Sequence, residues 1–372
     1  MKTYQICSCC ALDTTVPDIR FDTKGICNFC HDRNAFMAKD FAESYTPGKL
    51  KALIAEVKQC GQGKEYDCVI GLSGGVDSSY VAYEVTRLGL RPFAVHLDNG
   101  GDAPEATSNI SGIVDSLSLP FQNTKADLVV FKRIQVAYYR ASVLGIDNFS
   151  DHAILALLWH TAARLGVKYI IVGDNYSTES MLPGSWRHDA YDLVNIKDIC
   201  HRFGATLGAM PTISNRQLLS YRARRIRIIR LLNYYDYRKA EAKEVLKREV
   251  GWKDYGGKHC ENIYTRFAQC YMLPVKFNID KRKYHLSSLI RSGQMSRDEA
   301  LKQLAEPPYE REQFERDLKF ILDSLGLTKE QFDEIMLLPV KNHTDYKVGW
   351  LTNWASRLPE PAKSLARKII KL

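Results

Sequence analysis

Hydrophobic residues along the central part of the chain alternate between short strand-like runs and longer helical patterns. Residues 68–72, 92–97 and 168–173 are apolar runs rich in β-branched residues, and a weaker run covers 121–124. Between the runs, apolar residues recur every three or four positions, as Val81, Val85 and Leu88 do, which is typical of amphipathic helices. Strands that alternate with helices predict an α/β fold with a parallel sheet and helices on both of its faces.

The first strand is joined to the first helix by a glycine-containing turn, Ser73-Gly74-Gly75-Val76-Asp77-Ser78. Two adjacent glycines permit unusual backbone angles and a close approach of a ligand. The free amide groups at the helix start favour an anion. The hydroxyls of Ser73, Ser78 and Ser79 can donate to phosphate oxygens, whereas Asp77 would repel a bare phosphate and therefore indicates a divalent cation such as Mg²⁺. The turn thus predicts a site for a metal-bound polyphosphate, although the Walker pattern GxxxxGK[ST] is missing.

Further polar residues follow the other strands. Asp98 comes after the second strand, and Gly173, Asp174 and Asn175 end the run at 168–173. Ligands of open α/β sheets bind beyond the carboxyl ends of the strands, so these residues should lie near the glycine turn. Asp151 and His152 stand at the start of a predicted helix. They are candidate ligand contacts, and a core or capping role is the alternative for His152.

Four cysteines near the N-terminus have the spacing of a metal site. Cys7 and Cys10 form one CxxC pair, and Cys27 and Cys30 form a second. Four thiolates at this spacing suit tetrahedral Zn²⁺, and a metal would stabilise a segment too short to build a core. An iron–sulfur cluster or a redox dithiol is the alternative, and Cys9 could compete with Cys10 as a ligand.

Composition limits the class of protein without choosing its substrate. The 372 residues suffice for two or more domains, and the formal net charge of +9 favours an anionic partner, whether nucleotide, sugar nucleotide or nucleic acid. No apolar run reaches the length of a membrane span, and no apolar signal segment precedes the cysteines. We expect a cytoplasmic protein without membrane contact, whose ten cysteines are ligands, catalysts or core residues.

The chain divides into four predicted parts: a zinc-binding segment (1–35), a helical connector (36–65), an ATP-binding domain (66–213) and a helical C-terminal domain (214–372). In the last part, a run of arginines is predicted to lie on a helix as a solvated face or an anion contact; it consists of Arg222, Arg224, Arg225, Arg227 and Arg230. Two capping boxes, Ser296 with Glu299 and Thr328 with Gln331, predict later helix starts.

The glycine turn resembles the SGGxDS signature of the PP-loop ATP pyrophosphatases, which bind the pyrophosphate end of ATP and adenylate a carbonyl oxygen. A closer resemblance, covering the chain to about residue 305, is to the N-acetyl sugar amidotransferase family of bacterial surface-polysaccharide (LPS O-antigen) and nonulosonic acid pathways. It is carried by the motifs at 7–30, 70–82, 95–100, 151–154, 173–186, 234–237, 256–282 and 292–301.

The resemblance implies an enzyme that uses ATP and Mg²⁺ to convert an N-acetyl group of a nucleotide-activated or acidic sugar into an acetamidino group. Ammonia would come from a separate class I glutaminase, together with a cyclase-like barrel protein, because the chain contains no glutaminase motif. Related enzymes place a distant lysine on the ATP phosphates, and Lys258, Lys281 and Arg282 are the candidates beside Asp77. Trp186 is a candidate for stacking on the sugar, with a loop anchor as the alternative.

A tRNA sulfurtransferase is the rival interpretation, since PP-loop proteins that carry zinc also thiolate tRNA. That chemistry usually requires a cysteine near the nucleotide, for which Cys200, Cys260 and Cys270 are the C-terminal candidates, while Cys68 is expected to be buried in the first strand. Under the amidotransferase interpretation no nucleic acid partner is expected. A non-catalytic scaffold is disfavoured by the intact glycine turn.

Overall fold

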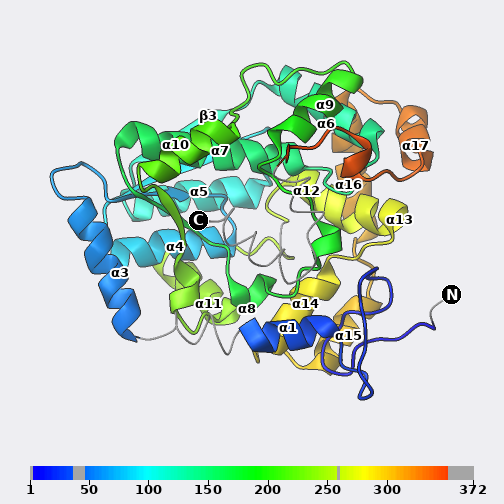
Figure 1. Ribbon diagram of the computed structural model, residues 1–372, viewed down its shortest axis with the longest axis horizontal. Coiled ribbons are helices and arrows are strands. Elements are labelled where there is room, and N and C mark those ends of the chain that lie inside the picture. Colours follow the sequence, from blue (N-terminus) through cyan, green and yellow to red (C-terminus); the bar gives the residue numbers. More distant parts are fainter. Residues whose placement is uncertain (1–2, 37–46, 258–259, 351–372) are drawn as a thin grey trace.

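The computed structural model describes residues 3–36, 47–257 and 260–350 (Figure 1). At its centre is a five-stranded sheet of order β3-β2-β1-β4-β5, in which every neighbouring pair is parallel. The strands are β1 (Cys68–Gly71), β2 (Pro92–Asp98), β3 (Phe121–Lys125), β4 (Tyr169–Val172) and β5 (Arg227–Arg230). The predicted fold class, a parallel sheet with helices on both faces, is confirmed.

Successive residues of β1 point into two separate cores, one on each face of the sheet. Cys68 and Ile70 of β1 pack into one core with α3 (Pro47–Cys60), α4 (Val76–Arg87), α5 (Pro104–Ser116) and α11 (Lys239–Val250). Val69 points into the other core, with α6 (Leu128–Ala141), α7 (Asn148–Leu165), α9 (Leu193–Arg202) and α10 (Asn215–Ala223). Strands covered on both faces are apolar throughout, which explains the continuous hydrophobic runs in the sequence.

The fifth strand corrects the prediction that the chain is helical from residue 214 onward. Arg222 lies in α10, but Arg227 and Arg230 belong to β5, which pairs with β4. The run is therefore not one charged helix face. Ile228 and Ile229 supply the apolar centre of this short strand at the sheet edge, where charged ends remain in contact with water.

The remaining C-terminal residues form short helices: α12 (Ile263–Phe267), α13 (Leu273–Phe277), α14 (Arg282–Arg291), α15 (Arg297–Ala305), α16 (Arg311–Leu325) and α17 (Lys329–Leu337). Phe267 and Phe332 bury their rings in the same core as α6 and α7, so these helices extend the α/β unit. Both predicted capping boxes, at Ser296 and at Thr328, are present. No helix among the described residues is long and apolar enough to cross a membrane.

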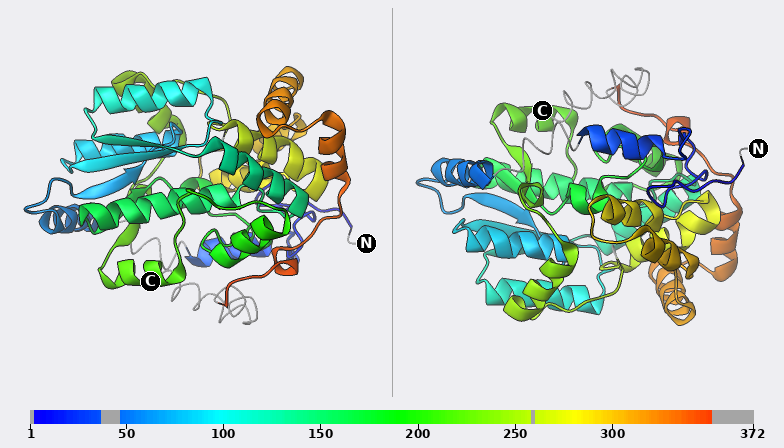
Figure 2. Two further views of the ribbon diagram at one scale, coloured as in Figure 1. Left: turned by 90° about the horizontal axis from the view of Figure 1, so that it is seen from above. Right: turned by 90° about the horizontal axis from the view of Figure 1, so that it is seen from below.

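Residues 3–36, which we call the cysteine module, form two turns and helix α1 (Asn28–Phe36) around the four cysteines. Isolated bridges pair Ile6 with Asp13 and Phe21 with Cys27. In Figures 1 and 2 the module (dark blue) lies against the yellow and gold helices α14 and α15, far from it in sequence. The two CxxC pairs thus form a compact unit that is packed on the C-terminal helices.

Candidate active site

The glycine turn lies at the point where the sheet changes its winding direction. From β1 the chain adds β2 and β3 on one side, and then returns to place β4 on the other side of β1. Such a switch point leaves a crevice at the carboxyl ends of the strands. The turn borders this crevice closely, because a Cβ on Gly173 after β4 would lie 2.9 Å from the carbonyl carbon of Asp77. A side chain at position 173 would therefore collide with the backbone of the turn, so glycine is required there.

Hydrogen bonds between its two serines hold the turn in shape. The hydroxyls of Ser73 and Ser78 are 3.0 Å apart, and the amide of Ser73 donates to Ser78 Oγ at 3.2 Å. Gly74 has a φ of +75°, and a Cβ at this position would lie 2.4 Å from the carbonyl oxygen of Ala106. Both the left-handed angle and the close approach demand glycine.

Two tyrosines from the C-terminal half contact the start of α4. The Tyr255 hydroxyl accepts a hydrogen bond from the amide of Val76 at 3.3 Å, at the end of the helix where anions bind. Tyr237 donates to Asp77 Oδ1 at 2.5 Å. Burial and the neighbouring Asp77 carboxylate raise the pKa of Tyr237 far above its ordinary value, so its hydroxyl keeps its proton. The Asp77 carboxylate is therefore held in one orientation.

Trp252 and Glu261, both from the C-terminal half of the chain, also lie against the glycine turn. The indole of Trp252 donates to the carbonyl oxygen of Gly74 at 2.9 Å, which fixes the turn from the side of α11. A Cβ on Gly75 would lie 3.2 Å from Oε1 of Glu261, so this carboxylate lies over the glycine turn. The backbone carbonyl of Glu261 accepts from the amide of Ala103 at 2.8 Å, which anchors the C-terminal segment beside β2.

The strand-end residues follow their strands as the sequence predicts, but their side chains differ in exposure and in hydrogen bonding. Asp98 Oδ1 accepts from the amide of Gly100 at 2.9 Å. Asp174 is exposed, and its carboxylate is 3.7 Å from Arg230 Nε. Asn175 is buried, because its side-chain oxygen caps α8 (Tyr176–Glu179) by accepting from the amide of Thr178. The side chain of Asn175 therefore stabilises the start of α8.

Asp151, Asp174 and Lys281 come together at the same edge of the sheet. Burial among protein atoms and the carboxylate of Asp147 raise the pKa of Asp151 to about 8; Asp174 adds to this shift and Lys281 opposes it. The Asp151 side chain is nevertheless exposed to solvent. Of the predicted residues, these three are therefore close enough to interact electrostatically.

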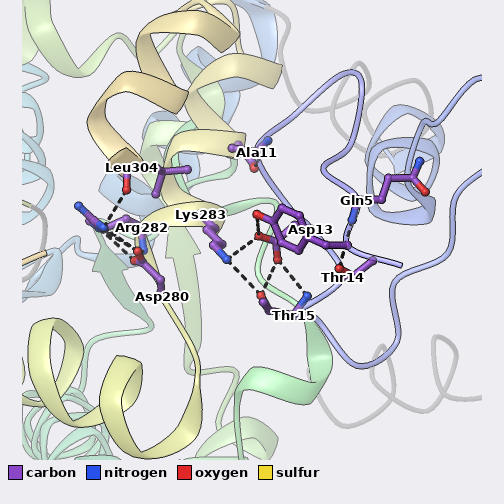
Figure 3. Close-up of polar contacts among 11 residues, drawn as sticks. Gln5, Ala11, Asp13, Thr14, Thr15, Asp280, Arg282, Lys283 and Leu304 are labelled. Carbon is purple, nitrogen blue, oxygen red and sulfur yellow. Dashed lines mark hydrogen bonds and ion pairs between the residues drawn. The ribbon is translucent and has the colours of Figure 1, made fainter. Parts of the chain in front are cut away.

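The other predicted cations have different positions. Arg282 donates through Nε and Nη2 to the carboxylate of Asp280, and through Nη1 to the carbonyl oxygen of Glu306 at 2.9 Å. Figure 3 shows the contact with Asp280 and a further one with the carbonyl oxygen of Leu304. These contacts connect α14 to the end of α15 and occupy the guanidinium that was predicted to bind phosphate. Lys258 lies outside the described residues, so its predicted role stays a prediction.

Three predicted ligand contacts have buried side chains. The ring nitrogens of His152 are bound to the carbonyl oxygen of Ala190 and the amide of Ile213, and burial lowers its pKa. Trp186 is 1% exposed, which leaves no ring face for a sugar to stack on. Ser79 is fully buried on the core side of α4. These positions correspond to the alternative of a core role for His152 and of a loop anchor for Trp186.

The four predicted cysteine ligands meet at one point. Their sulfur atoms all lie within 4.8 Å of one another, and all four residues are buried. The sulfurs of Cys7 and Cys30 are 3.9 Å apart, and those of Cys10 and Cys27 are 3.7 Å apart. Four sulfurs bound tetrahedrally to one Zn²⁺ lie about 3.8 Å from each other. The amide of Cys27 also donates to Cys7 Sγ at 3.2 Å, as expected for a thiolate. The cluster therefore fits a four-coordinate metal ion.

Comparison with known proteins identifies the C-terminal region. Residues 261–357 match the family model described as LPS biosynthesis protein WbpG-like, C-terminal domain. The matched segment starts at Glu261, over the glycine turn, and contains α12 to α17. The C-terminal part of this chain is thus similar to the WbpG-like C-terminal domain, and its first residue lies over the glycine turn.

Similarity to individual proteins is more distant. Over 328 residues the chain is 25% identical to the uncharacterized protein MJ1599 of Methanocaldococcus jannaschii, covering 83% of this chain and 96% of that protein. An NH3-dependent NAD synthetase from Campylobacter jejuni is 19% identical with a TM-score of 0.28, over 37% of this chain and 58% of the synthetase. An NMN synthetase from Francisella tularensis is 16% identical with a TM-score of 0.25, over 36% of this chain and 56% of that chain. The chain thus covers little more than half of either synthetase.

Proposed function

We propose that this chain is an ATP-dependent amidotransferase that converts an N-acetyl group of a sugar into an acetamidino group, in the biosynthesis of a surface polysaccharide such as LPS O-antigen or of a nonulosonic acid. The observation that carries this proposal is the turn at 73–78, whose left-handed Gly74 and helix-start amides border the switch-point crevice. The WbpG-like C-terminal domain supports the pathway. The family motifs in the sequence support the acetamidino product.

The proposed reaction makes a poor electrophile reactive. The oxygen of the N-acetyl group attacks the α-phosphorus of ATP, pyrophosphate leaves, and an imidate adenylate forms. Ammonia then attacks the imidate carbon, and the C–O bond to AMP breaks. The original amide oxygen leaves with AMP, and loss of one proton gives the neutral amidine. Positioning and neutralisation of phosphate charge are the main tasks of the protein in such a reaction.

The described residues suggest a division of these tasks. The backbone of Gly74 and Gly75, with the hydroxyls of Ser73 and Ser78, would hold the pyrophosphate. Asp77, oriented by Tyr237, would hold Mg²⁺, which supplies charge neutralisation on the phosphates when bound. Lys281 is the cationic candidate among the described residues, because Arg282 is occupied by Asp280. Asp98 and Asp174 would contact the nucleotide from the strand ends.

Zn²⁺ is the metal that we propose for the cysteine module. The ligands Cys7, Cys10, Cys27 and Cys30 leave no open position on a tetrahedral ion, which is the arrangement of structural zinc sites. The ion would stabilise the fold of the module.

The ammonia would be delivered by partner proteins. By family resemblance these are a class I glutaminase and a cyclase-like barrel protein. The acceptor would be a nucleotide-activated or acidic N-acetyl sugar.

The defining experiment incubates the protein with ATP, Mg²⁺, ammonium chloride and a panel of diacetamido uronic and nonulosonic nucleotides. We expect formation of AMP only with an acceptor sugar, and a product whose mass reflects replacement of oxygen by NH. Formation of AMP with tRNA and a sulfur donor, but with no sugar of the panel, would support the sulfurtransferase instead.

A further inference from the structure

Helix α14 is enclosed between the cysteine module and the segment that follows β4. Two consecutive serines on this helix, Ser287 and Ser288, have no exposed surface. One binds the cysteine module and the other binds the segment after α8. Ser287 Oγ accepts a hydrogen bond from the amide of Ala11 in the module at 3.0 Å, and Ser288 Oγ accepts from the amide of Met181 at 3.1 Å. A shift of the module would therefore be transmitted through one helical turn to the residues beyond α8.

Three consecutive basic residues stand at the start of α14: Lys281, which precedes the helix, Arg282 and Lys283. Each of them has different neighbours. Arg282 binds Asp280 and the last carbonyl groups of α15, and Lys283 binds Asp13 in the module at 2.6 Å (Figure 3). Lys281 remains, close enough to Asp151 for an electrostatic interaction. The structural contacts of its two neighbours thus fix where the Lys281 backbone lies.

Asp13 has the contacts of a specific anchor point. Its side chain is 2% exposed, and its carboxylate accepts from Lys283 Nζ, Thr15 Oγ1 and the Tyr4 hydroxyl. Asp13 stands three residues after Cys10. A metal that holds Cys10 therefore also restrains the carboxylate to which Lys283 is attached.

The module also contacts the segment 180–186 directly. Arg33 Nε donates to Ser180 Oγ at 2.9 Å, and Ser185 Oγ donates to Asp18 Oδ1 at 2.8 Å. On the other side, Arg297 of α15 donates to the carbonyl oxygens of Cys7 and Cys10. The segment after α8 and helix α15 are thus both attached to the cysteine module.

We propose that the cysteine module is a metal-dependent brace that positions α14 and residues 176–186 at the active site, with Asp13 and Lys283 as the positioning pair. The inference rests on the proposed function only for the identity of the ligands that bind at the active site. The brace itself follows from the contacts between segments about 270 residues apart in sequence, such as Asp13 and Lys283.

The first test removes the metal from the full chain with a mercurial reagent and a chromogenic chelator, and follows amide hydrogen exchange. We expect exchange to accelerate by about tenfold or more in peptides covering 176–186 and 282–291, while peptides of β1, β2 and α4 remain unchanged. Re-addition of Zn²⁺ should restore protection. Unchanged exchange in α14, or an equal increase throughout the sheet, would overturn the proposal. None of these outcomes depends on the catalysed reaction.

The second test changes the positioning pair and leaves the cysteines intact. Lys283→Met should keep one zinc per chain and yet raise the exchange rate of 282–291. Lys283→Arg should retain protection, because a guanidinium can also bind Asp13. Lys319→Met is the matched control, since Lys319 on α16 pairs with Asp323 at the surface. If Lys283→Met does not fold because Asp13 is left buried and unpaired, the double variant Asp13→Asn/Lys283→Met removes both charges.

A kinetic measurement distinguishes positioning from general stability. In Lys283→Met we expect the half-saturating concentration of the acceptor sugar to rise by about tenfold, which corresponds to about 1.4 kcal/mol of lost binding. The value for Lys283→Arg should stay near that of the unmodified protein. Equal losses in Lys283→Met and in Lys319→Met would contradict the positioning role. If no sugar is turned over at all, the proposed function fails, whereas the exchange results still decide the brace.

Discussion

The hydroxyl of Tyr237 donates a 2.5 Å hydrogen bond to the carboxylate of Asp77, a residue 160 positions earlier in the chain. Tyr237 is 2% exposed and packs against Tyr80, one helical turn beyond Asp77 on α4. The segment between β5 and α11 thus reaches back to orient the acidic residue of the glycine turn. If Asp77 holds Mg²⁺, this orientation belongs to the metal site.

Removing the Tyr237 hydroxyl should therefore weaken the use of Mg²⁺. In Tyr237→Phe the carboxylate loses a hydrogen bond to a charged group, which is typically worth about 1.5–3 kcal/mol. We expect the Mg²⁺ concentration for half-maximal AMP formation to rise by about tenfold. Tyr83→Phe, on the same helix, is the control and should not change the Mg²⁺ dependence. An unchanged Mg²⁺ requirement in Tyr237→Phe would show that Asp77 does not hold the cation.

Gly74→Ala should abolish nucleotide binding by deforming the turn. A left-handed backbone costs an L-residue about 1–2 kcal/mol, and here the added Cβ would also meet the Ala106 carbonyl oxygen. Gly63→Ala is a matched control, because Gly63 has a similar φ of +73° but no atom within 4 Å of the added Cβ. We expect both variants to lose thermal stability and only Gly74→Ala to lose ATP binding in calorimetry. ATP binding by Gly74→Ala with unchanged affinity would place the nucleotide elsewhere.

Asp151 should make the stability of the ligand-free protein depend on pH. Because its pKa is raised to about 8, the folded state keeps a proton on Asp151 between about pH 4 and pH 8 that the unfolded chain has released. The contribution of this group to the free energy of unfolding is therefore greatest at low pH and falls as the pH rises through this interval. Asp151→Asn removes it, so the melting temperature of the variant should gain on that of the unmodified protein as the pH rises. Parallel melting curves at all pH values would argue against the raised pKa.

The two half-buried candidates for sulfur transfer should be dispensable. Cys260 precedes Glu261 near the glycine turn, and Cys270 interacts with it; neither is fully buried. If ammonia is the nucleophile, Cys260→Ser and Cys270→Ser should form AMP and product at nearly the normal rate with ammonium. Loss of the reaction in either variant, with an intact fold by circular dichroism, would favour a thiol intermediate.

Glutamine should not replace ammonium when the chain is alone. Glutamine should support turnover only after a glutaminase partner is added, whereas high ammonium should suffice without it. The measurement is glutamate release together with AMP formation. Glutamine-driven turnover by the isolated chain would refute the need for a partner.

The parts of the site that could be predicted from the sequence are those built from neighbouring residues. The turn at 73–78 contains its own glycines and serines, and the CxxC pairs carry their spacing, so local chemistry was sufficient. Tyr237, Trp252, Tyr255 and Glu261 reach the turn only through the packing of segments that lie far away in sequence. The quoted motifs at 234–237 and 256–282 were the available signal for two of them, Tyr237 and Glu261, but the motifs do not indicate which side chain reaches the turn.

The arginine run and His152 differ from their predicted roles for one reason: their surroundings are set by distant segments of the chain. Arg227 and Arg230 flank an apolar pair in a four-residue edge strand, which is too short to show an alternating pattern among so many arginines. His152 follows an acidic residue near a helix start, as a ligand contact often does. Its partners are the backbone of Ala190 and Ile213, which the fold alone brings to its ring.

The bridge between Asp102 and Asn262 has a practical consequence for engineering. The backbone of residues 261–263 is bonded to that of 101–103 in both directions, through Ala103 to Glu261 and through Ile263 to Gly101. A chimera that exchanged residues 261–350 for those of a relative would have to take both sides of this junction from one parent chain. A crossover point inside this junction would disrupt the backbone hydrogen bonds that place the transplanted helices beside the loop at 101–103.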